Sequence, residues 1–259
     1  MFFPKLRRKA KWVFAFLALA FALSFVVAGV GTGFGSGFGD YLSELFNRQP
    51  GTNVSVEDAR EAVRANPRDS EAQLQLANAL IQEGRSEEAI AALVTYTDEV
   101  KNDEDALQQL AALYLTQANE AEQRATAAQI EGARAFFSSE LRDPESKLFQ
   151  GLPVGPVTQL EQQDASKAYS DALTAAQGAY GKEAAIWLRL TELQPQEPSF
   201  FFELGRSSQQ SQNTAQAVTA YETYLRLAPN DANAEQVREI VKQLKQQQSG
   251  VPPTGGGNG

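Results

Sequence analysis

The chain has 259 residues, no cysteine and no histidine, and 32 acidic against 23 basic side chains, for a formal net charge of −9. The missing Cys and His exclude thiol catalysis, imidazole acid–base catalysis, disulfides and the common zinc sites. Ala and Gln are abundant while runs of β-branched residues are scarce, and this composition favours helices over sheets.

The charge is unevenly distributed along the chain. Five basic side chains lie within the first eleven residues, so the remainder carries −14, from 18 basic against 32 acidic side chains. An acidic body repels the phosphate backbone of nucleic acids. We therefore expect no nucleic-acid binding, and we expect residues 1–11 to form a basic cytoplasmic N-terminus.

An uncharged, apolar run from Trp12 to Val30 follows this basic start, with Ser24 as its one polar side chain. As a helix it would be about 28 Å long, close to the ~30 Å hydrocarbon core of a bilayer. Asp40 and Glu44 follow the run, so the positive-inside rule predicts a cytoplasmic N-terminus and an extracytoplasmic C-terminal domain. The sequence therefore predicts a transmembrane helix over residues 12–30 and a single-pass membrane protein.

The alternative for the same run is a secretory signal that is cleaved, which would leave a secreted protein. Residues 31–54 are predicted to be a Gly-rich linker, in which glycines alternate with other residues up to Gly39 and Pro50-Gly51 follows. The glycines lack the preceding strand and the Lys-Ser/Thr pair of a phosphate-binding loop.

A helical body is predicted from Ser55 onward. Ser55-x-x-Asp58 is typical of a helix N-terminus, and Asn66-Pro67 ends that helix. Two helices are expected next, near Ser70–Glu83 and Ser86–Val100, with a turn at Gly84-Arg85 between them.

The following helix starts near Asp103, and its apolar residues keep helical spacing with no proline before Pro144. A return helix is expected from about Val157 to Leu193. A last helical pair spans Pro198–Pro229, and a capping helix with one apolar face runs from Asn230 to about Gln247. Residues 249–259, rich in Gly and Pro, are predicted to be a disordered tail.

One spacing pattern carries a resemblance to a known family. Leu204-Gly205, Ala217, Tyr221 and Pro229 stand at the intervals of the helix–turn–helix signature of the tetratricopeptide repeat. Pro195 precedes Pro229 by one period of that repeat, about 34 residues. The chain thus resembles the tetratricopeptide repeat family over residues 55–248. The resemblance implies an all-α fold, a solenoid of helical hairpins.

The repeat period is interrupted once. The interval from Pro67 to Pro195 exceeds two periods by roughly 60 residues. We predict an insertion over about residues 119–178 that lengthens both helices of one repeat into an elongated hairpin. The tip of this hairpin carries apolar residues that either contact a partner or cover the open end of the hairpin: Phe149, Leu152 and Val154.

In the family, side chains of the first helix of each repeat line a concave groove that holds a peptide or helix of a partner. Residue by residue, the resemblance places the following in this groove: Leu74, Asn78, Ile81, Gln108, Ala112, Leu115, Phe202, Arg206 and Gln209. Some members clamp a terminal carboxylate with Lys, Asn and Arg, but here only Asn78 and Arg206 fit and the lysines are missing. The alternative is that several groove residues pack against neighbouring repeats. The predicted core comprises Leu76, Leu80, Ala89, Leu110, Tyr114, Trp187, Leu204, Ala217, Tyr221 and Tyr224.

Together with the predicted membrane helix, the resemblance implies a membrane-anchored scaffold or adaptor that binds protein or peptide partners on the extracytoplasmic side. The alternatives are a chaperone-like holdase for exported or envelope proteins and a self-associating structural protein, a homo-oligomer. We expect no enzyme activity, no cofactor and no metal. The carboxylates are expected in solvated helix faces and loops, without the apolar surroundings that shift a pKa.

Overall fold

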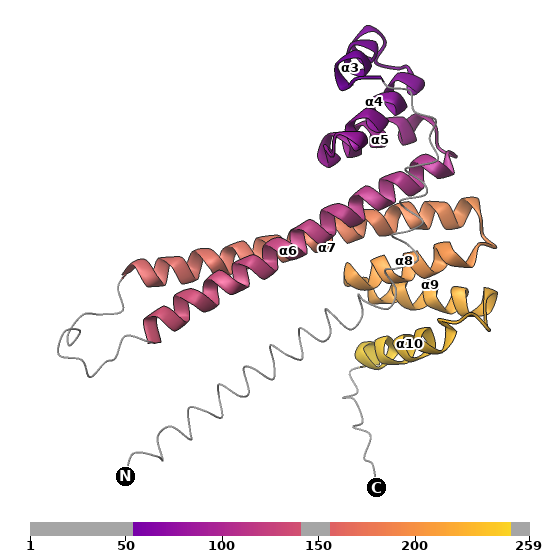
Figure 1. Cartoon of the computed structure of the whole chain (residues 1–259). Coiled ribbons are helices and arrows are strands. Elements are labelled where there is room, and N and C mark those ends of the chain that lie inside the picture. The colour runs from indigo at the N-terminus through magenta and orange to yellow at the C-terminus, as the bar shows by residue number, and fades with distance from the viewer. Residues whose placement is uncertain (1–53, 141–155, 250–259) are drawn as a thin grey trace, which may run out of the picture. The chain divides into compact units, whose positions relative to one another are not determined.

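Helices dominate the residues that the computed structural model describes, 54–140 and 156–249, which belong to the unit Asn53–Gly259. Within these two ranges there are eight α-helices and no strand. They are α3 (Val56–Ala65), α4 (Ser70–Gln82), α5 (Ser86–Glu99), α6 (Glu104–Glu140), α7 (Pro156–Leu193), α8 (Pro198–Gln210), α9 (Thr214–Leu227) and α10 (Ala234–Ser249). Each helix packs on the next one along the chain (Figure 1). The predicted all-α fold is confirmed for the described residues.

Acidic side chains at a repeating interval stabilise the helix N-termini. Asp69 accepts the first backbone N–H groups of α4, and Asp103, one repeat period later, accepts the N–H of Ala106 in α6. Glu197 caps α8 in the same way, and Asp231, again one period later, accepts an N–H in the turn before α10. A carboxylate suits these positions because it satisfies N–H groups that have no partner in the helix and faces the positive end of the helix dipole. The longer interval from Asp103 to Glu197 contains the interruption of the period.

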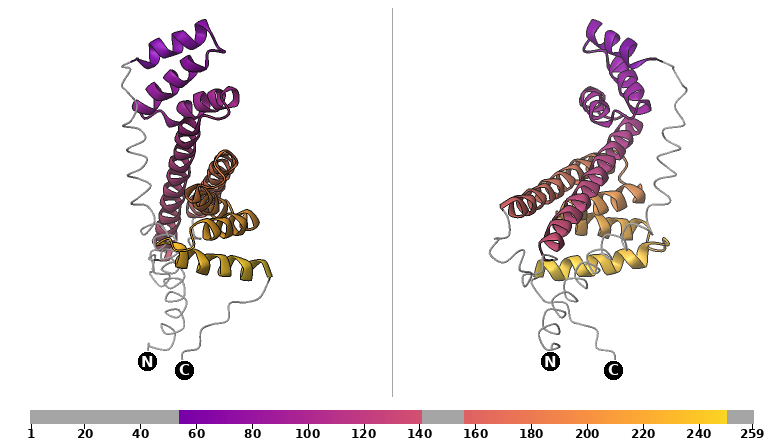
Figure 2. Two further views of the ribbon diagram at one scale, coloured as in Figure 1. Left: turned by 90° about the vertical axis from the view of Figure 1, so that its right-hand side faces the viewer. Right: turned by 60° about the vertical axis from the view of Figure 1, so that its left-hand side comes forward.

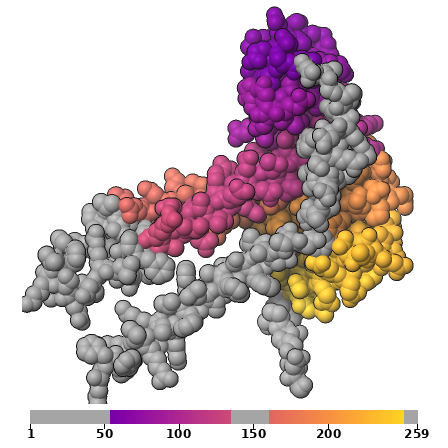
Figure 3. All heavy atoms as spheres, in the orientation of Figure 1, coloured from indigo at the N-terminus to yellow at the C-terminus, as the bar shows by residue number. Residues whose placement is uncertain are grey.

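The interruption is a long hairpin made by α6 and α7, of 37 and 38 residues. The two helices lie side by side (Figures 1 and 2), and their atoms meet in the space-filling view (Figure 3). Buried alanines face each other between them, namely Ala118, Ala121, Ala176 and Ala179. Small side chains allow this close approach. The predicted tip residues lie outside the described residues.

The apolar core forms inside each helical pair and continues onto the next helix. One cluster joins α3, α4, α5 and α6, and another joins α9 to α10. Nine of the ten predicted core residues are buried. Leu76 is the exception, because it packs on the first cluster from its edge and stays partly exposed.

The capping helix α10 begins at Ala234 rather than at the predicted Asn230. The reason is the turn before it, in which Asp231 accepts the hydroxyl of Tyr224 and the N–H of Asn233. Because this side chain holds residues 228–233 in a turn, the helix starts four residues later than expected.

The predicted single-pass membrane protein is contradicted. Among residues 54–140 and 156–249, no helix combines the length and the apolar character that a membrane span requires. The two long helices carry recurring charges, such as Glu122 and Arg124 in α6, and charged side chains are costly at bilayer depth. The run 12–30 on which the prediction rested, the linker up to residue 53 and the tail from residue 250 lie outside the described residues.

Candidate functional site

The nine predicted groove residues occupy one register on the first helices of the three pairs, α4, α6 and α8. Leu74, Asn78 and Ile81 on α4 are all partly exposed. Leu74 and Ile81 also pack along the edge of the first core cluster, so their orientation is fixed. The face of α4 therefore offers an apolar, amide and apolar side chain over two helical turns.

The equivalent residues of α6 are less accessible. Gln108 is 6% and Ala112 is 1% exposed, because α6 packs against both α5 and α7. Leu115 packs beside the alanine cluster of the long hairpin. A partner therefore has no access to Gln108 or Ala112, and the groove prediction is corrected at these two positions.

On α8, two predicted groove residues belong to the packing of the last repeat. The ring of Phe202 lies 6.1 Å from that of Tyr221 and 5.4 Å from that of Tyr224, measured between centroids. The side-chain oxygen of Gln209 accepts a 3.2 Å hydrogen bond from the hydroxyl of Tyr221. Phe202 and Gln209 therefore pack against the neighbouring helix, as the alternative interpretation of the groove residues predicts.

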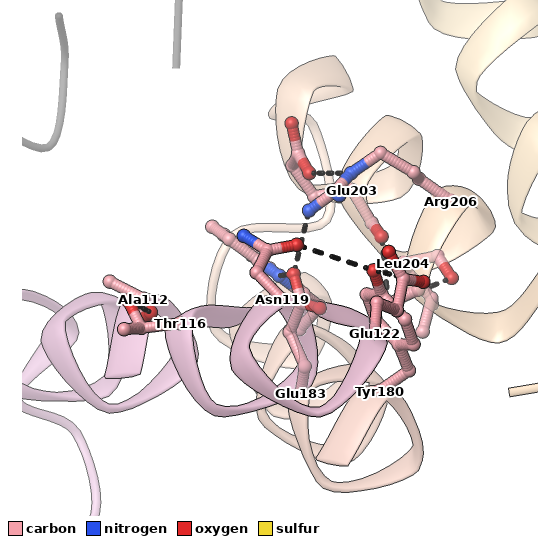
Figure 4. Close-up of polar contacts among 11 residues, drawn as sticks. Ala112, Thr116, Asn119, Glu122, Tyr180, Glu183, Glu203, Leu204 and Arg206 are labelled. Carbon is pink, nitrogen blue, oxygen red and sulfur yellow. Dashed lines mark hydrogen bonds and ion pairs between the residues drawn. The ribbon is translucent and has the colours of Figure 1, made fainter. Parts of the chain in front are cut away.

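Arg206, the third predicted residue of α8, binds two carboxylates of its own chain (Figure 4). Its Nη2 donates to Oε1 of Glu183 at 2.7 Å and its Nε donates to Oε2 of Glu203 at 2.7 Å. The Arg206 side chain is 23% exposed and that of Glu183 is 0% exposed. The guanidinium therefore joins α7 to α8 instead of being held open for the terminal carboxylate of a partner.

Glu183 is the centre of a buried polar network. Besides Arg206, the indole N–H of Trp187 donates to Oε1 of Glu183 at 3.1 Å. Burial raises the pKa of Glu183 to about 7; Arg206 opposes this shift and the charge of Glu203 adds to it. Burial by itself would lower the pKa of Arg206, but Glu203 and Glu183 outweigh it, so the pKa is raised and the guanidinium stays charged.

The network extends to α6 through Tyr180. The hydroxyl of Tyr180 donates to Oε1 of Glu122 at 3.0 Å and lies 3.5 Å from Oδ1 of Asn119 (Figure 4). Burial and the charge of Glu122 raise the pKa of Tyr180, so it remains a neutral donor. Side chains of three helices, α6, α7 and α8, thus meet around Glu183 and Arg206.

The expectation that all carboxylates are solvated is wrong for Glu183. The signal that identifies it is helical spacing, since Glu183 falls in the same stripe as Ala176, Ala179, Tyr180 and Trp187, which are all buried. A carboxylate in such a stripe must be paired, protonated or both. Its partner Arg206 comes from another helix, and the sequence does not reveal that pairing.

The described residues show no arrangement for metal chemistry. Over residues 54–140 and 156–249, no three acidic side chains gather in a way that could hold a metal ion. The arrangement they do show is a series of helical faces, of which those of α4 and α8 are partly exposed, and a buried network that joins α7 to α8.

Comparisons with known proteins agree with this architecture. Residues 49–129, which include α3, α4, α5 and the first part of α6, match a family model described as Tetratricopeptide repeat. Residues 198–231, which include α8 and α9, match a second model of the same description. No curated protein matches the chain. These two segments of the chain are therefore similar to tetratricopeptide repeats, and the end of α6 and all of α7 lie between the two matches.

Proposed function

We propose that this protein is a scaffold or adaptor that binds a partner polypeptide on the α4 face, defined by Leu74, Asn78 and Ile81. The observation that carries the proposal is the match of two segments to the tetratricopeptide repeat. Stacked helical hairpins of this kind present preformed, extended binding surfaces. The lack of His and Cys supports binding without catalysis.

The α4 face is favoured over the α6 face because Leu74, Asn78 and Ile81 are partly exposed, whereas Gln108 and Ala112 are buried. The three residues of α8 are partly exposed as well, but their side chains already bind or pack on other side chains of the last repeat and of α7. Two apolar side chains seven positions apart, with an amide between them, suit the apolar face of an amphipathic helix or an extended segment.

The net charge of the segment that contains this face indicates which partners suit it. Residues 55–103 carry 11 acidic against 5 basic side chains. Rim charges of one sign favour partners of the opposite sign by speeding association and excluding like-charged competitors. We therefore expect a partner segment in which basic residues flank apolar ones.

Photo-crosslinking tests the proposal, with a photoreactive amino acid at position 78 of the full chain. A discrete adduct is expected, and Leu74→Glu should abolish it. Asn78→Arg should weaken the affinity for the captured partner at least tenfold, because the added positive charge repels the expected basic residues of that partner. Gln210→Arg makes a matched control, because Gln210 is exposed at the end of α8 rather than on α4 and the substitution adds the same charged side chain.

The other outcomes separate the alternatives. Adducts with many unrelated chains would indicate a holdase, and an adduct with a second copy of this chain would indicate self-association. Absence of any adduct above background, with circular dichroism unchanged, would contradict the scaffold. A charge at Phe202 is unsuitable for this test because its ring packs on two tyrosines, so the substitution would unfold the last repeat.

A further inference from the structure

This chain contains no side-chain type that ordinarily titrates near neutral pH. It has no His and no Cys, while unperturbed carboxyl groups titrate near pH 4 and Tyr and Lys near pH 10. A response of the side chains to pH between 5.5 and 8.5 therefore requires a group whose surroundings have moved its pKa.

Glu183 has the geometry for such a shift. Its side chain is fully buried on α7 and has two inequivalent oxygens. Oε1 accepts from Trp187 and Arg206, whereas Oε2 is buried and has no hydrogen-bond partner among the residues that the structure describes. A buried oxygen without a donor is costly for a carboxylate, and a proton on that oxygen removes the charge.

The charged and titratable groups around Glu183 come from three helices. Arg206 and Glu203 face it from α8, Tyr180 belongs to its own helix, and Glu122 on α6 binds Tyr180. One guanidinium is thus shared by two carboxylates, Glu183 and Glu203. When Glu183 is ionised, the single positive charge of Arg206 does not balance this group.

We propose that protonation of Glu183 is a pH-sensitive lock at the joint between α7 and α8. The neutral acid leaves the positive charge of Arg206 to Glu203 and permits tight packing of the last repeat on the long hairpin. Ionisation above neutral pH places a second negative charge in the buried joint and weakens that packing.

The direction follows from linkage. The pKa of Glu183 in the folded protein, about 7, lies above its ordinary value of 4.5, so the folded state binds the proton more tightly than the unfolded state. The stability due to this proton is fully present below pH 4.5 and is lost as the pH rises through 7. From pH 5.5 to 8.5 the folding equilibrium constant should fall by about 30-fold through this group.

Trp187 reports on the proton directly, because its indole N–H donates to Glu183. The chain has two tryptophans, Trp12 and Trp187, so a full-length Trp12→Phe variant isolates the signal of Trp187. Its fluorescence should change with a midpoint near pH 7 while the circular dichroism stays helical. Adding Glu183→Gln should abolish the transition.

A second variant, at Glu203, tests whether Glu183 acts as a pH-sensitive lock or has only a structural role. The charge of Glu203 raises the pKa of Glu183 and competes for Arg206, so Glu203→Gln should move the midpoint to lower pH without removing it. The proposal is overturned if the Trp12→Phe protein shows no transition between pH 5.5 and 8.5. It is also overturned if the transition persists in Glu183→Gln or does not move in Glu203→Gln.

Discussion

Gly205 on α8 lies directly against the ring of Tyr221 on α9. A Cβ atom at position 205 would be 2.5 Å from Cδ1 and 2.9 Å from Cγ of that ring, which is far inside van der Waals contact. Tyr221 is buried, so the ring has no free direction in which to move. In the first repeat, Ala77 stands in the place of Gly205 and Leu93 in the place of Tyr221. The smaller Leu side chain there leaves room for the Cβ atom of Ala77.

Gly205→Ala should therefore destabilise the protein despite the better helix propensity of Ala. We expect a loss of about 2 kcal/mol in the free energy of unfolding, in the usual range for overpacking. Urea denaturation followed by circular dichroism measures it. Gly178→Ala in α7 is the matched control, because a Cβ there meets nothing within 4 Å and should stabilise by about 0.5–1 kcal/mol. Equal effects of the two substitutions would contradict the close contact.

The turn between α8 and α9 carries a backbone conformation that its residue disfavours. Gln212 has φ of 63°, and the equivalent turn after α4 places Gly84 there with φ of 72°. In both turns the next residue donates its N–H five positions back, from Arg85 to Leu80 and from Asn213 to Ser208. Both helices therefore end in the same left-handed turn.

Gln212→Gly should raise the free energy of unfolding by about 0.5–1 kcal/mol, because glycine adopts positive φ without a steric penalty. Gly84→Ala should lower it by about 1 kcal/mol, although space around that position is open. Thermal unfolding of the two variants checks both signs. A destabilised Gln212→Gly protein would show that the side chain contributes more than the backbone strain costs.

A tyrosine of the second helix holds the acidic side chain before the next helix in both matched segments. Tyr224 donates to Asp231 at 2.6 Å and Tyr96 donates to Asp103 at 2.6 Å. The pKa of Asp231 lies below its ordinary value, first because of the Tyr224 hydroxyl and then because of the N–H of Asn233. A lowered pKa means that this interaction stabilises the fold at neutral pH and that the effect is lost as the pH falls through the folded pKa.

Tyr224→Phe should lower the free energy of unfolding at pH 7 by about 1 kcal/mol, the ordinary net contribution of one hydrogen bond. The difference from the parent protein should shrink in acid as Asp231 becomes protonated. Urea denaturation at pH 7 and at pH 2, well below the ordinary pKa of an aspartate, tests this. Tyr169→Phe should change little at either pH, because Tyr169 is 37% exposed on α7. A Tyr224→Phe deficit that is the same at both pH values would assign the loss to packing.

Local sequence signals identified the helices and their order. Caps, the Gly84 turn and the apolar spacing depend on neighbours within a few residues, and so α4 and α5 end within one residue of their predicted bounds. The long hairpin was predictable because no proline interrupts α6 and because alanines recur at helical spacing in both arms. The start of α10 was misplaced, since it depends on the contact between Tyr224 and Asp231.

The positions of the candidate site are encoded in the sequence, but their exposure is not. The register that groups Leu74 with Gln108 and Phe202 follows from the repeat period alone. Whether each of these positions is exposed or buried depends on which helices pack beside it, and this separates the buried Gln108 and Ala112 of α6 from the partly exposed residues of α4 and α8. The same holds for Arg206, whose charge is visible in the sequence but whose partners Glu183 and Glu203 are not.

The sequence by itself determined the all-α class and the place of the long hairpin, because both depend on residues that interact within one or two helical turns. It also determined the repeat period, because the same local signals recur at a fixed interval along the chain. Only the tertiary structure decided which groove positions stay accessible and that Glu183 is buried beside Arg206. These features arise between helices, where side chains 23 or more residues apart compete for the same space, and no local pattern records the outcome of that competition.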